Sequence, residues 1–355
     1  YLNGVCQRMK VGIATVQVPF TTGGAELLAD GLCAQIKKRG HEAEVISMPF
    51  KWYPPSCLIN EMEASRLLDV TEVNGTPIDL LITLKFPAYF FQHSNKVMWM
   101  LHQHRQAYDL YGTQHGDLHT THEGIKVSKL IKQWDDQYIP EHKSLFTISN
   151  TVSKRLSHYN NLNSEPLYPP PFNDELFHCN SWENFILAPG RIDSLKRQAL
   201  IIEAMTEVPH SVKLILIGND QSKYANFCKK RVEELELNSR VIFMGLVNEA
   251  QKVDLYSRAT AVYNGVFDED FGYVTIESFL SGKPVVTHSD SGGPLEFVIS
   301  GENGFVTEPS PNAIAHSFRK IFETPNFACE MGKNGYESIK GKKITWTSVI
   351  ERLLS

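Results

Sequence analysis

Two glutamates, Glu269 and Glu277, stand eight positions apart in a segment whose pattern predicts a helix over residues 271–281. The first turn of a helix has unpaired N–H groups and the positive end of the helix dipole. Glu269 precedes that turn, and the side chain of Glu277 tilts back toward it. Both carboxylates can therefore line one crevice beside backbone donors, which suits a polyhydroxylated ligand that carries phosphate. Either glutamate alone is explained as well by a helix-entry charge or a solvated face.

Two further segments could bind phosphate. Arg191 and Lys196 follow the apolar strand predicted over residues 185–189, where a forked guanidinium and a compact ammonium suit a diphosphate. Gly23 and Gly24 lie between the first predicted strand and the first predicted helix, where glycines allow close approach of backbone N–H groups to an anion. A solvated basic loop and a tight turn are the plain alternatives for these two segments.

Histidines and a further glycine loop complete the polar segments. His102 and His104 follow a predicted strand, and either could donate or accept a proton near neutral pH. A metal site at this pair lacks a supporting ligand cluster, and we expect none among the histidines of residues 115–122. The loop over residues 288–296 contains two glycines. We expect this loop either to contact a ligand or to lead into a helix.

Short apolar strands alternate with helical patterns along the whole chain, which favours parallel sheets covered by helices. The predicted strands are 11–16, 44–47, 80–85, 96–101, 145–149, 185–189, 213–218, 241–244, 260–263 and 284–287. The predicted helices, besides that of the glutamate pair, are 25–38, 198–206, 223–237, 248–257 and 346–354. Three consecutive prolines at 169–171 interrupt the alternation, so we place a domain boundary there. The chain is predicted to hold two successive doubly wound α/β domains.

Composition excludes several classes of protein. The 355 residues suit about two domains, and the net charge of −5 gives no basic excess for nucleic-acid binding. The six cysteines form no metal or redox spacing, which favours a reduced, cytoplasmic setting. We see neither a signal peptide nor a stretch of about 18 apolar residues that would predict a transmembrane helix. We interpret Met9 as the natural start, and residues 1–8 as either upstream sequence or an addition to the natural chain.

In combination, the order of glycine loop, histidine, Arg/Lys pair and glutamate pair resembles the retaining glycosyltransferases of family four, of the group 1 type, which have the GT-B fold. The resemblance implies two Rossmann-like doubly wound parallel-sheet domains facing an interdomain cleft. We expect an acceptor-side domain over residues 1–170, a donor-side domain over 171–335, and a C-terminal helix within 336–355 that crosses back to the first domain. Further matching segments are 9–11, 149–150, 168–171, 243–245, 291–296 and 301–305.

The resemblance also implies roles for the residues that bind the donor. Gly23 and Gly24 would approach its β-phosphate and sugar, while Arg191 and Lys196 would hold the diphosphate. Neither pair is assigned a covalent step, because the donor phosphate itself would take the acceptor proton.

The remaining implied roles concern the sugars. Glu269, with the backbone of Phe271 and Gly272, would contact hydroxyls of the transferred sugar, and Glu277 would accept from the donor ribose. His104 is our choice for the active-site histidine near the transferred sugar, with His102 as the alternative. Substitution of Glu277 is then expected to weaken nucleotide binding, whereas substitution of Glu269 is expected to lower turnover.

The expected activity is transfer of a hexose from a nucleotide-diphosphate sugar to an acceptor hydroxyl with retention, in polysaccharide, lipopolysaccharide or glycolipid biosynthesis. We expect neither a cofactor nor a metal ion, and a saccharide or lipid-linked saccharide as acceptor. Peripheral contact with the inner face of a membrane stays open. The alternatives are a sugar-nucleotide epimerase or a phosphorylase of the same fold, and a non-catalytic module that binds nucleotide sugars.

Overall fold

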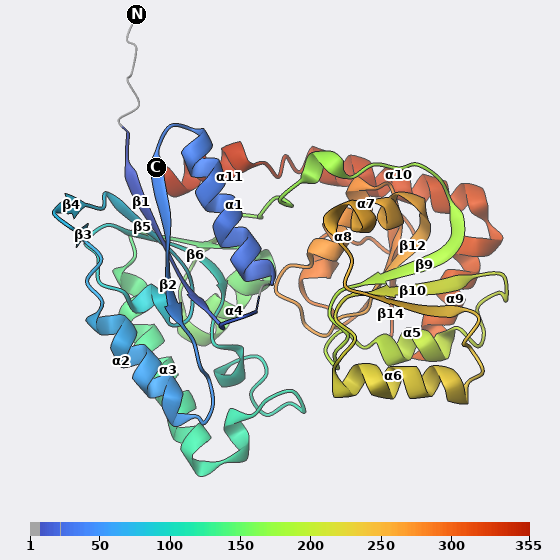
Figure 1. Ribbon diagram of the computed structural model, residues 1–355, viewed down its shortest axis with the longest axis horizontal. Helices are drawn as coiled ribbons and strands as arrows, with labels where there is room; N and C mark the ends of the chain where they lie inside the picture. Colours follow the sequence, from blue (N-terminus) through green and yellow to red (C-terminus); the bar gives the residue numbers. More distant parts are fainter. Residues whose placement is uncertain (1–7, 22) are drawn as a thin grey trace, which may run out of the picture. The chain divides into compact units, whose positions relative to one another are not determined.

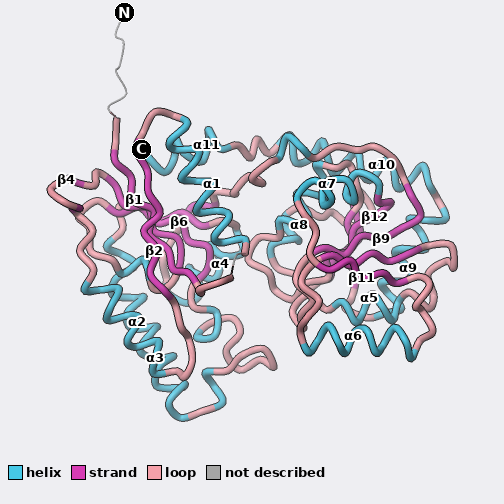
Figure 2. The backbone as a smooth tube through the Cα atoms, viewed as in Figure 1, coloured by secondary structure: helices cyan, strands magenta, loops and turns pink. Residues whose placement is uncertain are grey.

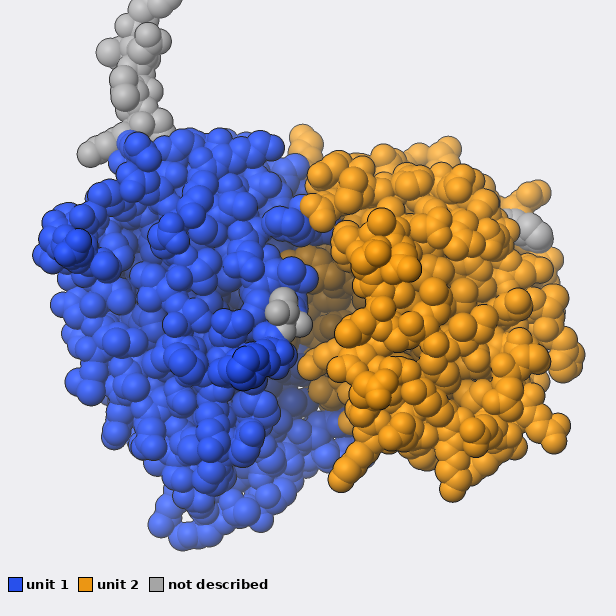
Figure 3. Space-filling view, in the orientation of Figure 1, with its two compact units in different colours: residues 1–172, 344–355 blue, residues 173–343 orange. Residues whose placement is uncertain are grey.

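The computed structural model describes residues 8–21 and 23–355, so most of the segment before Met9, and Thr22 of the first glycine loop, lie outside the described residues. The described chain divides into two compact units, residues 1–172 with 344–355 and residues 173–343. Figure 3 distinguishes the two units by colour. The first segment of the first unit ends at residue 172, two residues beyond the boundary that we predicted after residue 170.

The first unit is built on a parallel sheet with strand order β2-β1-β5-β6-β7-β8 (Figure 1). Its strands are β1 (Lys10–Gln17), β2 (Glu42–Pro49), β5 (Leu80–Lys85), β6 (Lys96–His102), β7 (Ser144–Thr147) and β8 (Glu165–Pro166). Its helices are α1 (Gly24–Lys38), α2 (Ser56–Leu67), α3 (His122–Tyr138), α4 (Asn150–Asn160) and α11 (Trp346–Leu354). A short antiparallel hairpin joins β3 (Glu72–Val73) to β4 (Thr76–Pro77).

The C-terminal helix α11 belongs to the first unit because of its apolar face. Its buried residues are Trp346, Val349, Ile350 and Leu353, which recur at helical spacing. The Trp346 ring lies edge-on to buried Trp99 of β6, with ring centroids 6.3 Å apart. Gly31 of α1 allows this close packing, since a Cβ there would lie 3.3 Å from the Trp346 ring.

The second unit repeats the architecture, with parallel strand order β11-β10-β9-β12-β13-β14 (Figure 2). Its strands are β9 (Glu183–Pro189), β10 (Lys213–Ile217), β11 (Val241–Gly245), β12 (Ala259–Asn264), β13 (Val285–His288) and β14 (Gly304–Thr307). Its helices are α5 (Gln198–Ala204), α6 (Lys223–Glu234), α7 (Glu249–Arg258), α8 (Tyr273–Leu280), α9 (Pro311–Glu323) and α10 (Pro325–Gly341). Apolar residues of α5, α6 and α9 form one buried cluster with the alternate residues of β9, β10 and β12.

Two parallel sheets with covering helices confirm the predicted α/β class and the pair of Rossmann-like domains. In each sheet the order reverses next to the first strand of the unit, where loops leave the carboxyl ends of neighbouring strands in opposite directions. The segment that returns to the first unit begins at residue 344 and not at 336, because α10 continues unbroken to Gly341. No helix in the described part of the chain is both long and apolar enough to cross a membrane.

Candidate functional site

The N-terminus of α8 is shaped by glycines that have no room for a side chain. Gly272, with φ of +91°, precedes the helix, and a Cβ there would lie 2.9 Å from Pro294. A Cβ on Gly293 would lie 2.5 Å from the carbonyl oxygen of Phe271. The Phe271 ring is itself buried, 5.7 Å from the Phe297 ring. The backbone at Phe271 and Gly272 is thus closely packed against Gly293 and Pro294, and the ligand-binding role that the resemblance implies for it stays a prediction.

Lys196 and Glu269 meet although 73 positions separate them in the sequence. The Lys196 Nζ donates to Glu269 Oε1 at 2.5 Å, and the two side chains are 16% and 24% exposed. The other carboxylate oxygen, Glu269 Oε2, is buried and has no hydrogen-bond partner within the described residues. The structure thus brings together a cation suited to phosphate and a carboxylate with an unused acceptor, two groups that the sequence assigns to one site.

Arg191 lies in the same loop as Lys196 but in a different environment. Its side chain is 78% exposed, and its Nη2 lies 3.7 Å from Asp193 Oδ2. Its carbonyl oxygen accepts from Gln198 Nε2 at 2.9 Å, so the backbone is fixed while the guanidinium extends into solvent. Arg191 is therefore the more adaptable of the two predicted phosphate ligands.

Glu277 occupies a closed environment on α8, with a side chain that is 13% exposed. Its Oε1 accepts from Lys252 Nζ at 2.8 Å, and its Oε2 accepts from Tyr256 OH at 2.9 Å. Burial alone would lower the pKa of Lys252, but the Glu277 carboxylate outweighs it and raises that pKa. Burial, then Glu277, raises the pKa of Tyr256. Glu277 is thus a hydrogen-bond acceptor with fixed orientation, and Lys252 and Tyr256 are partners that the sequence pattern did not predict.

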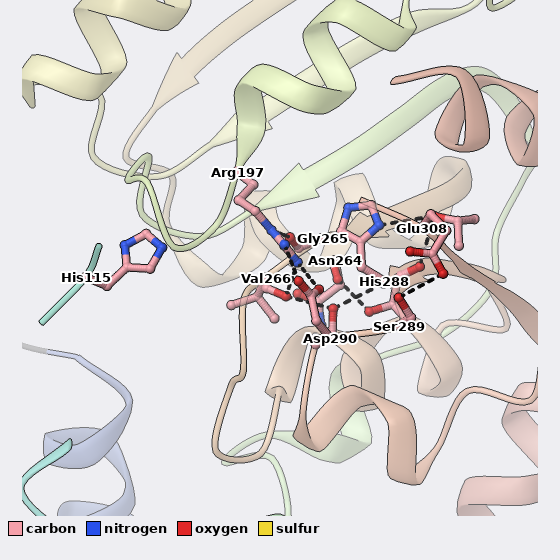
Figure 4. Close-up of polar contacts among 12 residues, drawn as sticks. His115, Arg197, Asn264, Gly265, Val266, His288, Ser289, Asp290 and Glu308 are labelled. Atoms are coloured by element: carbon pink, nitrogen blue, oxygen red, sulfur yellow. Dashed lines mark hydrogen bonds and ion pairs between the residues drawn. The ribbon is translucent and has the colours of Figure 1, made fainter. Parts of the chain in front are cut away.

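Arg197 joins three loops at the carboxyl edge of the second sheet (Figure 4). Its Nη1 and Nη2 donate to the Asp290 carboxylate at 2.8 and 2.6 Å. Its Nε donates to the carbonyl oxygen of Gly265 at 2.7 Å, and its Nη2 also donates to that of Val266 at 2.8 Å. These contacts tie the loop of residues 190–197 to the loops that follow β12 and β13. They hold Arg197 at φ of +52°, a conformation uncommon for a side chain of this size.

Backbone pairing completes this frame. The Glu269 N–H donates to the carbonyl oxygen of Ser291 at 2.9 Å, and the Gly293 N–H donates to that of Glu269 at 2.7 Å. Burial alone would raise the pKa of Asp290, but the Arg197 guanidinium outweighs it and holds that pKa below its usual range. His288, fully buried, contacts Tyr263 OH at 2.9 Å through Nε2, and burial followed by the Arg197 charge lowers its pKa to about 4. The glycine loop of residues 288–296 therefore positions Glu269 as part of the site.

In the first unit, Gly23 and Gly24 lie at the start of α1, beyond the carboxyl end of β1. The Gly23 N–H donates to Glu26 Oε2 at 2.8 Å, while Lys85 Nζ donates to Glu26 Oε1 at 3.1 Å. A Cβ on Gly24 would meet no atom within 4 Å, so this glycine faces open space. Gly24 and the first turn of α1 offer N–H groups to a ligand, whereas the Gly23 N–H already has a partner.

The two candidate histidines differ in environment. His104 is 9% exposed, its ring lies 5.0 Å from Phe86, and its Nε2 has no partner in the described part of the chain. Burial, then the His102 charge, lowers the pKa of His104 to about 3, so it is neutral at physiological pH. His102 is partly exposed at the end of β6, with Nδ1 at 2.6 Å from the carbonyl oxygen of Gln103. The choice of His104 stays a prediction.

Over residues 8–21 and 23–355, no group of three or more His, Cys, Asp or Glu side chains is arranged to hold a metal ion. The groups described above are instead paired cations and carboxylates, backbone N–H groups and glycine turns.

Comparison with known proteins agrees with this architecture. Residues 177–338 match the family model described as glycosyl transferases group 1. The matched range covers most of the second unit, and the two parallel-sheet units of the chain have the GT-B fold of the solved structures given below. The matched range contains Arg191, Lys196 and both glutamates.

Relatives and solved structures extend the comparison. The chain is 34% identical over 114 residues to the alpha-1,3/1,6-mannosyltransferase ALG2 of Dictyostelium discoideum, and 27% identical over 171 residues to human ALG2. These matches cover 32% and 44% of this chain and only 27% and 41% of the relatives. Sucrose-phosphate synthase of Thermosynechococcus elongatus has a TM-score of 0.78 at 18% identity, with 98% of this chain and 97% of that chain covered. HepE of Anabaena, solved with UDP-glucose, has a TM-score of 0.71 at 17% identity, with 98% of each chain covered.

Proposed function

We propose that the protein is a retaining glycosyltransferase that moves a hexose from a nucleoside diphosphate sugar to an acceptor hydroxyl. The observation that carries the proposal is the contact between Lys196 and Glu269 beside the N-terminus of α8, which has no side-chain cap. It combines a cation for a diphosphate, a carboxylate oxygen for a sugar hydroxyl, and backbone N–H groups in one place. The UDP-glucose complex of HepE supports a nucleotide-sugar donor, and the mannosyltransferase name of ALG2 supports transfer of a hexose.

The proposed chemistry needs positioning and charge stabilisation rather than a protein nucleophile. Lys196 and Arg191 neutralise the diphosphate as the bond to the sugar breaks. The departing phosphate oxygen takes the proton of the acceptor hydroxyl, which attacks on the same face. Glu277 accepts from the donor ribose, and Glu269 accepts from a hydroxyl of the transferred sugar. The protein then acts without a metal ion, in the cytoplasm, on a saccharide or lipid-linked saccharide in glycan biosynthesis.

A donor screen tests this function. Nucleotide sugars with uridine and guanosine bases are added singly, and the melting temperature is measured, because a ligand that binds the folded state raises it. The stabilising donor is then incubated with and without methyl glycosides, and proton NMR reads the anomeric configuration of the product. Retained configuration and acceptor-dependent turnover support the proposal. An altered free nucleotide sugar without acceptor would instead show an epimerase, and binding without turnover would show a non-catalytic module.

A further inference from the structure

A hollow of about 340 Å³ lies at the carboxyl edge of the first sheet, where β1 and β2 end. The Phe50 N–H donates to the carbonyl oxygen of Gln17 at 2.9 Å, so the loop after β2 begins directly beside the end of β1. The hollow is lined by this loop, by Val18 and Pro19 directly after β1, and by Glu61 of α2. Ligands of parallel α/β sheets bind at this edge. None of the residues assigned above to the donor lines this hollow.

Aromatic rings form one wall of the hollow. Trp52 is 38% exposed and Tyr53 is 59% exposed, although both have large apolar surfaces. The Trp52 ring is stacked on Phe50, with centroids 6.3 Å apart and planes at 28°, and the Tyr53 ring stands edge-on to Trp52 at 5.2 Å. Phe50 in turn packs edge-on against buried Phe86 at 6.3 Å. The exposed rings are therefore fixed to the core, and a flat apolar ligand face can stack on them at low entropic cost.

Polar groups complete the hollow. Glu61 Oε1 accepts from the Lys51 N–H at 3.2 Å, which fixes the carboxylate, and no hydrogen bond to Oε2 occurs among the described residues. Lys51 Nζ lies 5.4 Å from the centre of the Tyr53 ring. Burial raises the pKa of Glu61, with the Lys51 N–H acting in the opposite direction. The hollow thus offers an aromatic platform, a hydrogen-bond acceptor and a cation within one small volume.

We propose that this hollow binds a hexose ring of the acceptor, so that the acceptor is a saccharide and not a simple alcohol. A hexose has an apolar face of C–H groups that stacks on an aromatic ring and a rim of hydroxyls that donate to a carboxylate. The volume lies within the range of small-molecule sites. A membrane surface fits less well, since a carboxylate in a hollow resists burial in lipid. The proposal rests on the proposed glycosyltransferase function and names its second substrate.

The test uses the full chain and saturation-transfer NMR with methyl glycosides of mannose, glucose, galactose and N-acetylglucosamine. We expect transfer to the ring protons of at least one glycoside. Trp52→Ala should weaken that binding about tenfold, and Trp52→Phe about threefold or less. Glu61→Gln should also weaken it, because an amide nitrogen cannot accept from a hydroxyl. Phe227→Ala, which removes a ring that is 52% exposed on α6, is the matched control and should change nothing.

Two further arms distinguish the outcomes. UDP and GDP binding, measured by calorimetry, should be equal in the wild type and Trp52→Ala. If the wild type binds neither nucleotide, the proposed glycosyltransferase function is contradicted, but the proposal that the hollow binds a hexose is not. Vesicles of phosphatidylcholine and phosphatidylglycerol test the membrane alternative by co-sedimentation. Sedimentation that Trp52→Ala abolishes would overturn the proposal in favour of a lipid surface. A wild type that binds no glycoside, or binding that survives both Trp52→Ala and Glu61→Gln, would also overturn it.

Discussion

Glu269→Gln is expected to tighten the binding of a bare nucleoside diphosphate while slowing sugar transfer. In the structure Lys196 Nζ has Glu269 Oε1 as its partner at 2.5 Å, so a diphosphate must compete with the carboxylate for the ammonium group. An ion pair of this partly exposed kind is worth up to about 1 kcal/mol. Its removal also takes away a negative charge close to the diphosphate. We therefore expect about fivefold tighter binding of UDP or GDP.

Turnover should change in the opposite direction. If Glu269 accepts from a hydroxyl of the transferred sugar, loss of that charge-assisted hydrogen bond costs about 1.5–3 kcal/mol, or about 10- to 150-fold in kcat. A contact that tightens only in the transition state appears in kcat and not in substrate affinity. The opposite signs of the two effects separate this reasoning from a general loss of structure.

Calorimetric titration with UDP and GDP, beside steady-state kinetics with the full donor, measures both effects. Glu277→Gln is the comparator, because its carboxylate is already held by Lys252 and Tyr256 and is expected to contact the ribose. That variant should weaken nucleotide binding. The reasoning is refuted if Glu269→Gln loses nucleotide affinity as severely as Glu277→Gln. Absence of any change in both variants would count against the glycosyltransferase function itself.

Three further predictions concern the loops around the site and the buried histidine. Arg191→Ala should weaken nucleoside diphosphate binding less than Lys196→Ala, because the Arg191 side chain is 78% exposed and its charge is screened; calorimetry that finds both variants unchanged would exclude the phosphate role. Arg197→Gly, which suits the positive φ but removes the ties to Asp290, Gly265 and Val266, should lower kcat about tenfold. Arg258→Gln, which breaks an ion pair with Glu183 elsewhere in the unit, is its control, and equal kinetics in both variants would contradict a positioning role. His288 has a pKa of about 4 when folded and about 6.5 when unfolded, so its stabilisation is present above pH 6.5 and is lost as the pH falls toward 4, by up to about 1.4 kcal/mol per pH unit. Urea unfolding across this range should show a shallower acid loss in His288→Gln, and parallel curves would refute the assignment.

The elements with a clear apolar period were predictable from the sequence. The strand over residues 80–85 and the helix over 346–354 have the predicted bounds, because each is an uninterrupted apolar or amphipathic run. Helix α10 was not predicted, since Gly332 and Gly335 lower its helix propensity. Tertiary packing explains why glycine stands at both positions. A Cβ on Gly332 would lie 1.9 Å from the carbonyl oxygen of Gly282, and one on Gly335 would lie 2.4 Å from Phe279.

The candidate site was likewise predictable only as far as its features are local in the sequence. Glycine turns and the glutamate spacing are local patterns, so the sequence could indicate the loops that carry Arg191, Lys196 and Glu269. The partners of these loops are not local: Arg197 reaches Asp290 across 93 positions, and Tyr256 reaches Glu277 across 21. No periodicity encodes such pairs, because they depend on which strand ends the parallel order places side by side. Charged residues between a predicted strand and the next predicted helix were the available signal, and Arg197, between the strand over 185–189 and the helix over 198–206, fits that description.

Lys196 and Arg197 are neighbours in the chain with opposite physical roles. Arg197 is fixed by a forked ion pair and two carbonyl oxygens, so a ligand could displace it only by breaking all of these contacts together. Lys196 Nζ has a single described partner, Glu269, and can exchange that carboxylate for a phosphate. A protein with net charge −5 can in this way keep a cation neutralised until an anionic donor arrives. Under the proposed function, the fixed arginine would keep the loop in place during the exchange, and the freed Glu269 carboxylate would then be available to a sugar hydroxyl. One exchange of partners would thus couple diphosphate binding to readiness for sugar transfer.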